Sequence, residues 1–269
     1  MTRPPTRQCE RVFLAGSAGR IEAQIDSPAP GSLPRGARGV ALVAHPHPLY
    51  GGTLDNKVAK TLAKTFVELG WVAVRPNFRG AGASEGVHDH GGGETEDMVA
   101  VAGQALERYP GLPLALAGFS FGAFIQTRVA RRVAMRRLVL VAPPSGLVEG
   151  GRSYVTGDVP ADTIVIHGER DATVPLANVF DWARPQELPI VVIPGADHFF
   201  HRRLHLIRYI VKWSKGWRIG VVRPFRRIFS TGLQSRTILR SLTTSIRPAK
   251  SNWSRSSTGP CRICGASAK

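Results

Sequence analysis

Short apolar runs alternate with longer segments of helical length over the first 213 residues. The runs are almost continuously aliphatic, which is typical of parallel strands that are buried on both faces. We expect strands at residues 40–44, 71–74, 114–117, 138–141, 164–166 and 190–193. Between them, residues 55–69, 93–108, 122–133 and 175–183 have the length and pattern of helices.

This alternation predicts one α/β domain, residues 1–213, with a mostly parallel, doubly wound sheet that is flanked by helices. Residues 10–26 have the pattern of an antiparallel hairpin, which we place at an edge of the sheet. A chain of this length is long enough to bury a sizeable core.

The pattern ends near Ser214, where a basic tail begins. Residues 214–269 contain 12 Lys and Arg, no Asp or Glu, and no sustained period of 2 or 3.6. We expect most of this tail to be disordered or loosely attached to the domain. A frameshifted or read-through C-terminus would explain such a composition.

The net charge of +17 comes mainly from this tail. Residues 1–213 hold the other 24 basic residues against all 19 acidic ones, a net of +5, so we expect no specific nucleic-acid partner. No apolar run reaches the roughly 18 residues of a membrane span, and no secretory signal precedes the domain, so we expect a cytoplasmic protein. The odd number of cysteines, three in the whole chain, suggests no disulfide framework.

Candidate chemistry begins at Gly118-Phe119-Ser120-Phe121-Gly122, which follows an expected strand and precedes an expected helix. A tight turn in this place exposes a nucleophile at the carboxyl edge of the sheet, and small residues two positions away on each side avoid collisions. We therefore interpret Ser120 as a nucleophile. The alternative is a glycine-rich turn in which Ser120 only caps the helix.

A serine nucleophile needs a base, and the base needs an orienting carboxylate. With a turn of this kind the acid and then the histidine follow downstream. After the strand at 164–166, two acids compete, Glu169 and Asp171, and we favour Asp171 because it lies deeper in the loop. The alternative is that either acid is a solvated loop charge or a helix cap.

The base is predicted to be His198, which follows a glycine turn beyond the strand at 190–193. His201 and His205 lie one and two helical turns further on, and we expect them to be surface or packing residues. We expect His167, at the end of a strand, to pack under the site.

The oxyanion of an acyl-transfer intermediate needs two backbone N–H donors. We predict one at Phe121, directly after the nucleophile, and the other at His47 in the loop that follows the strand at 40–44. Pro46 and Pro48 have no N–H, which favours His47. A competing interpretation treats His45 and His47 as a metal-binding pair, although it requires further ligands at later strand ends.

With these motifs assembled, residues 10–213 resemble the small, lidless α/β-hydrolases related to dienelactone hydrolases. The resemblance implies an α/β-hydrolase fold, a triad of Ser120, Asp171 and His198, no cofactor, no metal, and esterase-like activity. The chain differs from true dienelactone hydrolases in having Ser in place of Cys as the nucleophile, and the resemblance ends near Trp213. It rests on His45-Pro46-His47-Pro48, on the stretch Gly51-Gly52-Thr53-Leu54-Asp55-Asn56-Lys57, on Asn77-Phe78-Arg79-Gly80, on Gly118-Phe119-Ser120-Phe121-Gly122, on His167-Gly168-Glu169-Arg170-Asp171, and on Gly195-Ala196-Asp197-His198-Phe199-Phe200.

Two further loops bear on the site. Asn77 and Arg79 follow the strand at 71–74 and either line the site or brace the loop; we favour bracing, and expect a helix-face or bracing role for Asp97. Larger relatives place a lid between the strands at 138–141 and 164–166. Here that connection is short and Gly-rich, so we expect no large lid, an open site, and small acyl substrates.

The sequence thus predicts a serine hydrolase that cleaves a small ester or thioester through an acyl-Ser120 intermediate. The alternative is a non-catalytic interaction module of the same fold, whose basic tail binds nucleic acid or an anionic membrane. The tail has no recognisable nucleic-acid motif, which favours the enzyme. The expected partner is a small-molecule acyl substrate, and the sequence leaves the oligomeric state open, a homodimer included.

Overall fold

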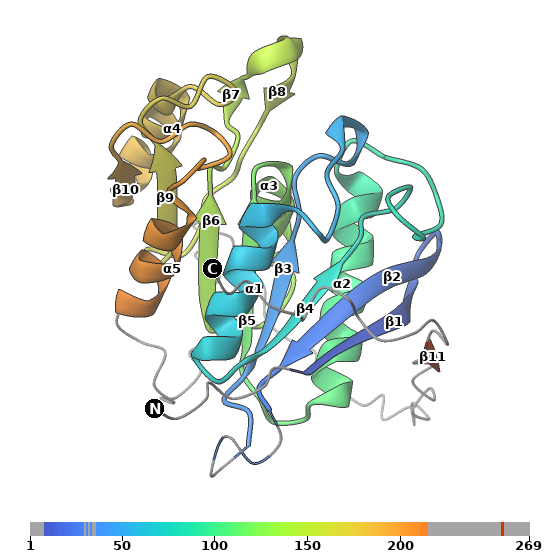
Figure 1. The fold of residues 1–269 in the computed structure, drawn as a ribbon. Coiled ribbons are helices and arrows are strands. Elements are labelled where there is room, and N and C mark those ends of the chain that lie inside the picture. The colour runs from blue at the N-terminus through green and yellow to red at the C-terminus, as the bar shows by residue number, and fades with distance from the viewer. Residues whose placement is uncertain (1–7, 30, 32, 34–35, 215–253, 256–269) are drawn as a thin grey trace, which may run out of the picture.

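A computed structural model describes residues 8–29, 31, 33, 36–214 and 254–255. The described chain forms a nine-stranded sheet in the order β10-β9-β6-β5-β3-β4-β2-β1-β11 (Figure 1). Six central strands pair in parallel, and β1 and β2 pair antiparallel to their neighbours, as the sequence predicts. The strands are β1 Gln8–Gly16, β2 Gly19–Ser27, β3 Val40–Ala44, β4 Val72–Pro76, β5 Leu114–Phe119, β6 Arg137–Val141, β9 Ile164–Gly168, β10 Ile190–Ile193 and β11 Ser254–Arg255.

Helices cover both faces of this sheet. The helices α1 and α5 pack on one face with Ala41 and Val43, whereas α2, α3 and α4 pack on the other with Val40 and Leu42. Every residue of β3 is buried, because its alternating side chains enter two different cores. The helices are α1 Lys57–Glu68, α2 Gly92–Arg108, α3 Phe121–Val129, α4 Leu176–Ala183 and α5 Leu204–Trp213.

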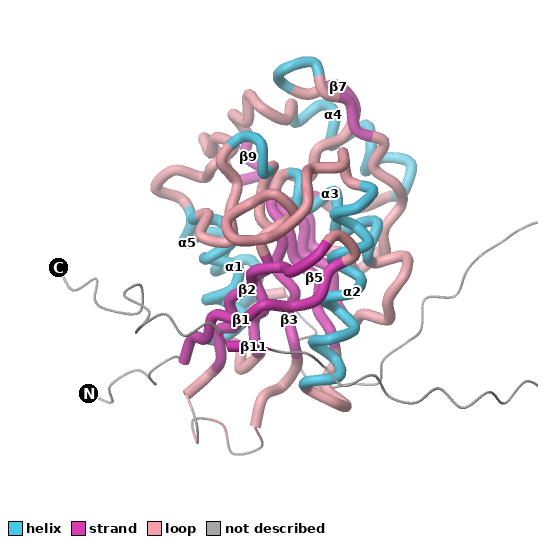
Figure 2. Tube along the Cα trace, turned by 90° about the vertical axis from the view of Figure 1, so that its right-hand side faces the viewer, coloured by secondary structure: helices cyan, strands magenta, loops and turns pink. Residues whose placement is uncertain are grey.

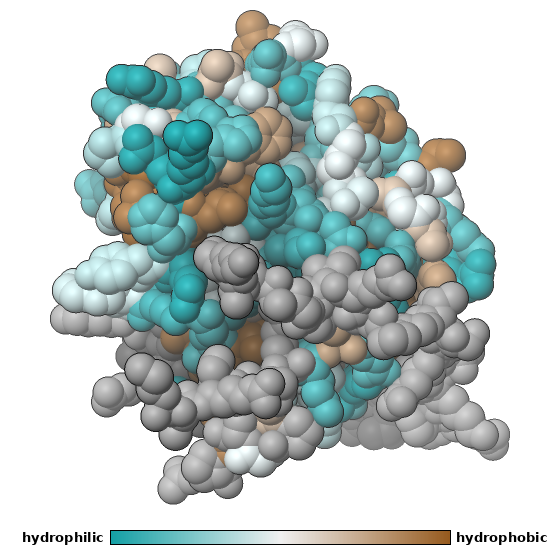
Figure 3. All heavy atoms as spheres, viewed as in Figure 1, coloured by the Kyte–Doolittle hydropathy of each residue, from teal (hydrophilic) through white to brown (hydrophobic). Residues whose placement is uncertain are grey.

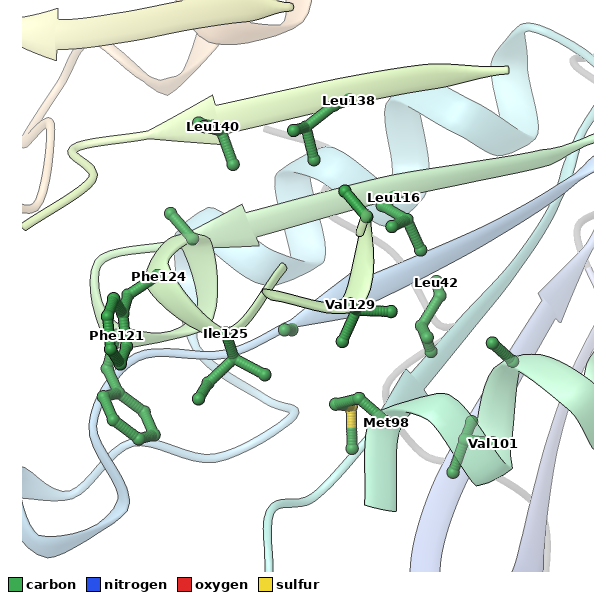
Figure 4. Packing of buried hydrophobic residues seen from close by; sticks show 14 of the residues in the cluster. Leu42, Met98, Val101, Leu116, Phe121, Phe124, Ile125, Val129, Leu138 and Leu140 are labelled. Atoms are coloured by element: carbon green, nitrogen blue, oxygen red, sulfur yellow. The ribbon is translucent and has the colours of Figure 1, made fainter. Parts of the chain in front are cut away.

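The helix α3, which follows Ser120, is anchored in the larger core. Figure 4 shows Ile125 and Val129 of α3 beside Leu116 of β5 and Met98 of α2, and all four side chains are completely buried. The helix is shorter than the expected 122–133 and ends at Val129. Its first turn is held firmly against the sheet, which fixes the position of the turn before it.

The helix α5 was not predicted from the sequence. Its buried residues Ile207 and Val211 are one helical turn apart and pack in the core beside α1. Its N-cap residue, Arg203, makes no side-chain capping hydrogen bond, so the usual signal for a helix start is missing.

The connection between β6 and β9 contains no lid, in agreement with the expectation. It forms a small hairpin of β7 (Gly146–Leu147) and β8 (Ser153–Tyr154), with the 3-10 turn η2 (Glu149–Gly151) between them. Figure 1 shows this hairpin beyond the carboxyl ends of the strands, at the top of the view. The hairpin therefore adds no separate helical layer above the sheet edge, as a lid would.

The predicted tail lies almost entirely outside the described residues. Its residues Ser254 and Arg255 form β11, which pairs antiparallel with Phe13 and Val12 of β1 (Figure 2). Over the part of the chain that the structure describes, no helix is long and apolar enough to cross a membrane.

Candidate functional site

Ser120 lies in the turn between β5 and α3, in a conformation that side chains rarely adopt. Its backbone has φ 53° and ψ −123°, and its N–H donates to the Val141 carbonyl at 2.9 Å. A Cβ at Gly118 would lie 2.3 Å from the Gly122 carbonyl oxygen, and one at Gly122 would lie 2.4 Å from the His45 carbonyl oxygen. Neither glycine position has room for a side chain. The surrounding backbone holds Ser120 in its strained conformation.

Asp171 follows β9 and is almost fully buried. Its Oδ1 accepts a hydrogen bond from the Val174 backbone N–H at 2.7 Å, and its Oδ2 lies 2.7 Å from His198 Nδ1. Glu169 points elsewhere, because its exposed carboxylate accepts the Gly195 N–H at 2.6 Å. Of the two acids left open by the sequence, Asp171 is the one that faces the histidine.

His198 connects this acid to the serine. Its Nδ1–H donates to Asp171, which leaves Nε2 as an acceptor 3.0 Å from Ser120 Oγ. The imidazole also packs beside Phe119, with ring centroids 5.0 Å apart. Three residues that are far apart in sequence thus form one hydrogen-bonded chain at the carboxyl edge of the sheet, an arrangement able to activate a serine hydroxyl.

The other downstream histidines have different surroundings. His167 is completely buried below Asp171, its Nε2–H donates to the Val174 carbonyl at 3.0 Å, and burial lowers its pKa. His201 and His205 are exposed, and His201 pairs with Asp197 at 2.6 Å. These placements agree with the packing and surface roles expected from the sequence.

The loop after β3 lies against the residue that follows Ser120. The rings of His47 and Phe121 pack with centroids 4.8 Å apart. Phe121 is the first residue of α3, so its N–H has no partner within the helix, and no acceptor for the His47 N–H occurs among the described residues. The backbone N–H groups of both residues therefore have no acceptor inside the described part of the chain, while their side chains lie in contact.

His45 supports this loop from inside the core. Its Nε2 accepts the Phe78 N–H at 2.9 Å and its Nδ1–H donates to the Pro46 carbonyl at 2.6 Å, so both ring nitrogens are occupied. This use of both nitrogens argues against a metal-binding pair of His45 and His47. No group of three or more metal-ligating side chains occurs within the described ranges.

Burial lowers the pKa of both loop histidines to about 4. For His45, the hydrogen bond to the Pro46 carbonyl partly opposes the effect of burial on the pKa. For His47, the positive charges of His88, Arg152 and His90 lower the pKa further, by less than burial does. Both imidazoles are therefore neutral at pH 7, because each pKa lies well below that value.

The buried His45 predicts a loss of stability in mild acid. Unfolded histidine has a pKa near 6.5, so below that value the unfolded chain binds a proton that folded His45 takes up only near pH 4. The contribution of His45 to the free energy of unfolding is therefore present in full above pH 6.5 and decreases as the pH is lowered. Between pH 7 and pH 5 this residue alone should lower that free energy by about 2 kcal/mol. Urea unfolding at both pH values should show a smaller loss for His45→Gln than for wild type. The exposed His205→Gln should keep the wild-type loss, and an unchanged loss in His45→Gln would contradict the assignment.

The loop after β4 is braced, as the sequence favours. Arg79 Nε donates to Asp97 Oδ2 at 2.8 Å, and its guanidinium also donates to Ser17 Oγ at 2.7 Å. Asn77 accepts the Leu54 N–H at 2.7 Å and donates to Glu22 at 2.7 Å. These side chains join the loop to β2 and to the start of α1 rather than facing Ser120.

One wall of the site was not anticipated from the sequence. The rings of His88 and Tyr154 lie 5.4 and 6.5 Å from the ring of Phe121, and the ring of Tyr50 lies 4.8 Å from that of His47. The Arg152 guanidinium lies over the Tyr50 ring at 4.4 Å. These residues come from three irregular loops, where neither periodicity nor a motif signals that they meet.

Known proteins share this architecture. A family model described as serine aminopeptidase, S33, matches residues 51–156. An uncharacterized protein of Rickettsia prowazekii (strain Madrid E) is 32% identical over 199 residues, 71% of this chain and 82% of that protein.

Two solved structures are similar over nearly their whole length. A lidless α/β serine hydrolase from Xanthomonas campestris is 34% identical, with a TM-score of 0.70, and the match covers 78% of this chain and 96% of that one. An α/β serine hydrolase homologue from Coxiella burnetii is 37% identical, with a TM-score of 0.65 over 76% of this chain and 96% of that one. With the turn at residues 118–122 that carries Ser120 (the nucleophile elbow), its sheet order and these relatives, the chain belongs to the lidless α/β serine hydrolases.

Proposed function

We propose that this protein hydrolyses small carboxylic esters or thioesters through an acyl-Ser120 intermediate. The observation that carries the proposal is the hydrogen-bonded chain from Asp171 through His198 to Ser120, with distances of 2.7 and 3.0 Å. A non-catalytic module has no need of this chain, nor of a strained serine at the end of β5.

In the acylation step, Ser120 Oγ attacks the carbonyl carbon while His198 Nε2 accepts the hydroxyl proton. The backbone N–H groups of Phe121 and His47 stabilise the negative oxygen of the tetrahedral intermediate. Asp171 accepts the Nδ1–H of His198 and so stabilises the imidazolium. His198 then gives the proton to the leaving alcohol or thiol, and the acyl group remains on Ser120.

Deacylation repeats these steps with water as the nucleophile. His198 takes a proton from water, the hydroxide adds to the acyl carbon, and collapse returns the proton to Ser120 Oγ. No cofactor or metal enters this scheme. The short connection between β6 and β9 favours small acyl groups, in keeping with the motifs shared with the hydrolases related to dienelactone hydrolases.

A fluorophosphonate probe tests the proposal directly, because it reacts with activated serine nucleophiles. Wild-type protein should be labelled at Ser120, and Ser120→Ala should lose the label completely. Ser214→Ala, which removes a hydroxyl at the far end of α5, should be labelled like wild type. Equal labelling of Ser120→Ala would refute the assignment, and a panel of esters and thioesters of graded acyl length would then define the preferred substrate.

A further inference from the structure

Arg152 lies beside the proposed oxyanion loop and has an ordered position. Its Nε and Nη2 donate to the Glu149 carbonyl at 3.2 and 2.9 Å, and its guanidinium stacks on the Tyr50 ring at 4.4 Å. Two residues further on, the ring of Tyr154 lies 6.5 Å from the ring of Phe121. The β7–β8 hairpin thus holds a cation beside Tyr50, whose ring packs against that of His47.

This cation has no acidic partner. Among the described residues, no carboxylate lies within ion-pair distance of Arg152, whereas Arg75, Arg79 and Arg137 each pair with one. The nearest acid in sequence, Glu149, uses its carboxylate to accept the Thr173 hydroxyl at 2.9 Å. The guanidinium has five N–H donors, and its internal contacts leave some of them for an external acceptor.

The ionisable groups of the neighbouring segment are three histidines and two acids, and the carboxylates of both acids accept hydrogen bonds within that segment. His47 and His88 pack together with ring centroids 4.5 Å apart, and His90 follows at 5.1 Å from His88. The carboxylate of the buried Glu94 accepts hydrogen bonds from the backbone N–H groups of Asp89 and Gly91 at 2.9 and 2.8 Å. It also contacts the ring of His88. Asp89 in turn accepts the Gly93 N–H at 2.7 Å.

Exposed apolar side chains occur in the two segments that carry Tyr50 and Arg152. Leu49, Leu147 and Val155 are strongly exposed, and they flank Tyr50 and Arg152 in sequence. Figure 3 shows brown, hydrophobic groups standing among hydrophilic ones at the upper end of the molecule, where the hairpin lies. A surface of this composition favours a substrate with an apolar body and one anionic group.

We propose that Arg152 binds an anionic group, a carboxylate or a phosphate, on the ester or thioester that Ser120 attacks. The proposal rests on the hydrolase activity proposed above and names its substrate class. A charge-assisted hydrogen bond from the half-buried guanidinium orients the substrate carbonyl toward Ser120. Since no lid closes over the site, a fixed cation at its edge is the main device for selecting a polar substrate.

Matched ester pairs test this proposal. One pair carries the charge on the acyl side, 4-nitrophenyl hemiglutarate against 4-nitrophenyl valerate. Two others carry it on the leaving group, with butyrate esters of 4-hydroxybenzoate and of 4-hydroxyphenyl phosphate against phenyl butyrate. The measured quantity is kcat/KM for the anionic ester divided by kcat/KM for its neutral match.

In at least one pair, the wild-type protein should prefer the anionic ester. Arg152→Gln should lower the ratio of the two kcat/KM values about 30-fold, because one charge-assisted hydrogen bond to the substrate is lost. Arg152→Lys keeps the charge and should recover part of the ratio. Arg184→Gln, which removes the same charge from an exposed pair with Asp181, should leave it unchanged. The pair that responds identifies which anion, on which side of the ester, Arg152 binds.

Two outcomes would overturn the proposal. In the first, the wild-type protein prefers no anionic ester; in the second, Arg152→Gln lowers kcat/KM equally for the anionic ester and its neutral match. Fluorophosphonate labelling of Ser120 separates this failure from failure of the hydrolase itself. If Ser120 is labelled and neutral esters are cleaved while the ratio stays unchanged, only the role of Arg152 is wrong. If Ser120→Ala keeps activity, the hydrolase proposal fails as well.

Discussion

Replacement of Asp171 by asparagine should lower kcat by about 10⁴-fold without unfolding the protein. The oxygen of the new side-chain amide can still accept the Val174 N–H, as Asp171 Oδ1 does now at 2.7 Å. The amide NH₂ would then face His198 Nδ1, which could only accept from it. The imidazole proton would move to Nε2, and His198 could no longer accept the proton of Ser120. Steady-state hydrolysis of a nitrophenyl ester measures this loss.

Glu169→Gln is the matched control for this change. It makes the same acid-to-amide substitution two residues away in the same loop, and the glutamine oxygen can still accept the Gly195 N–H. We expect its kcat to stay within about threefold of wild type, because Glu169 has no contact with His198. The reverse result, an inactive Glu169→Gln and an active Asp171→Asn, would show that the wrong acid was assigned. Far-UV circular dichroism of both variants checks that the fold is retained.

The sequence could predict five of the six parallel strands because both of their faces are covered, which leaves a continuous apolar run; β10 lies at the sheet edge and is partly exposed, but it keeps a run of four aliphatic residues. It could also predict the position of Ser120, since the space around Gly118 and Gly122 admits no side chain. The choice between Glu169 and Asp171 rested on depth in the loop alone. The structure supplies the physical reason, which is the Val174 N–H that turns the Asp171 carboxylate toward His198.

What the sequence could not predict depends on contacts between distant segments. Asp26 and Arg75 form a buried ion pair at 3.0 Å between β2 and β4, and neither residue belongs to a recognisable motif. The strands β7 and β8 have two residues each, too few for any periodicity. The wall formed by Tyr50, Arg152 and Tyr154 likewise exists only when the two loops that carry it are brought together.

Another set of contacts between distant segments lies at the nucleophile elbow, residues 118–122. The helix α3 begins so close to β3 that the backbone of Gly122 faces the carbonyl oxygens of Ala44 and His45. The same strand end continues into His47, which supplies one proposed oxyanion donor, and His45 binds the Phe78 N–H of the next loop. The distance between α3 and β3 therefore determines the positions of both Ser120 and the loop that carries His47. Gly122 determines that distance, because it has no side chain.

Substitution of Gly122 by alanine should accordingly destabilise the protein by about 3 kcal/mol or more and lower hydrolysis at least 100-fold. A Cβ there would lie 2.4 and 2.5 Å from the His45 and Ala44 carbonyl oxygens, so α3 or β3 must move. Helix propensity alone predicts the opposite sign, a gain of about 1 kcal/mol for Gly→Ala within a helix. The midpoint and slope of urea unfolding measure the change.

Gly103→Ala provides the comparison, because Gly103 is exposed within α2 and has no atom within 4 Å of the added Cβ. This variant should gain the stability that propensity predicts and keep full activity. The same chemical change in two helices should then give opposite signs, and the difference measures the steric requirement at the elbow. Equal gains at both positions would show that α3 can move away from β3 at no cost, and the elbow would then owe its geometry to Gly118 alone.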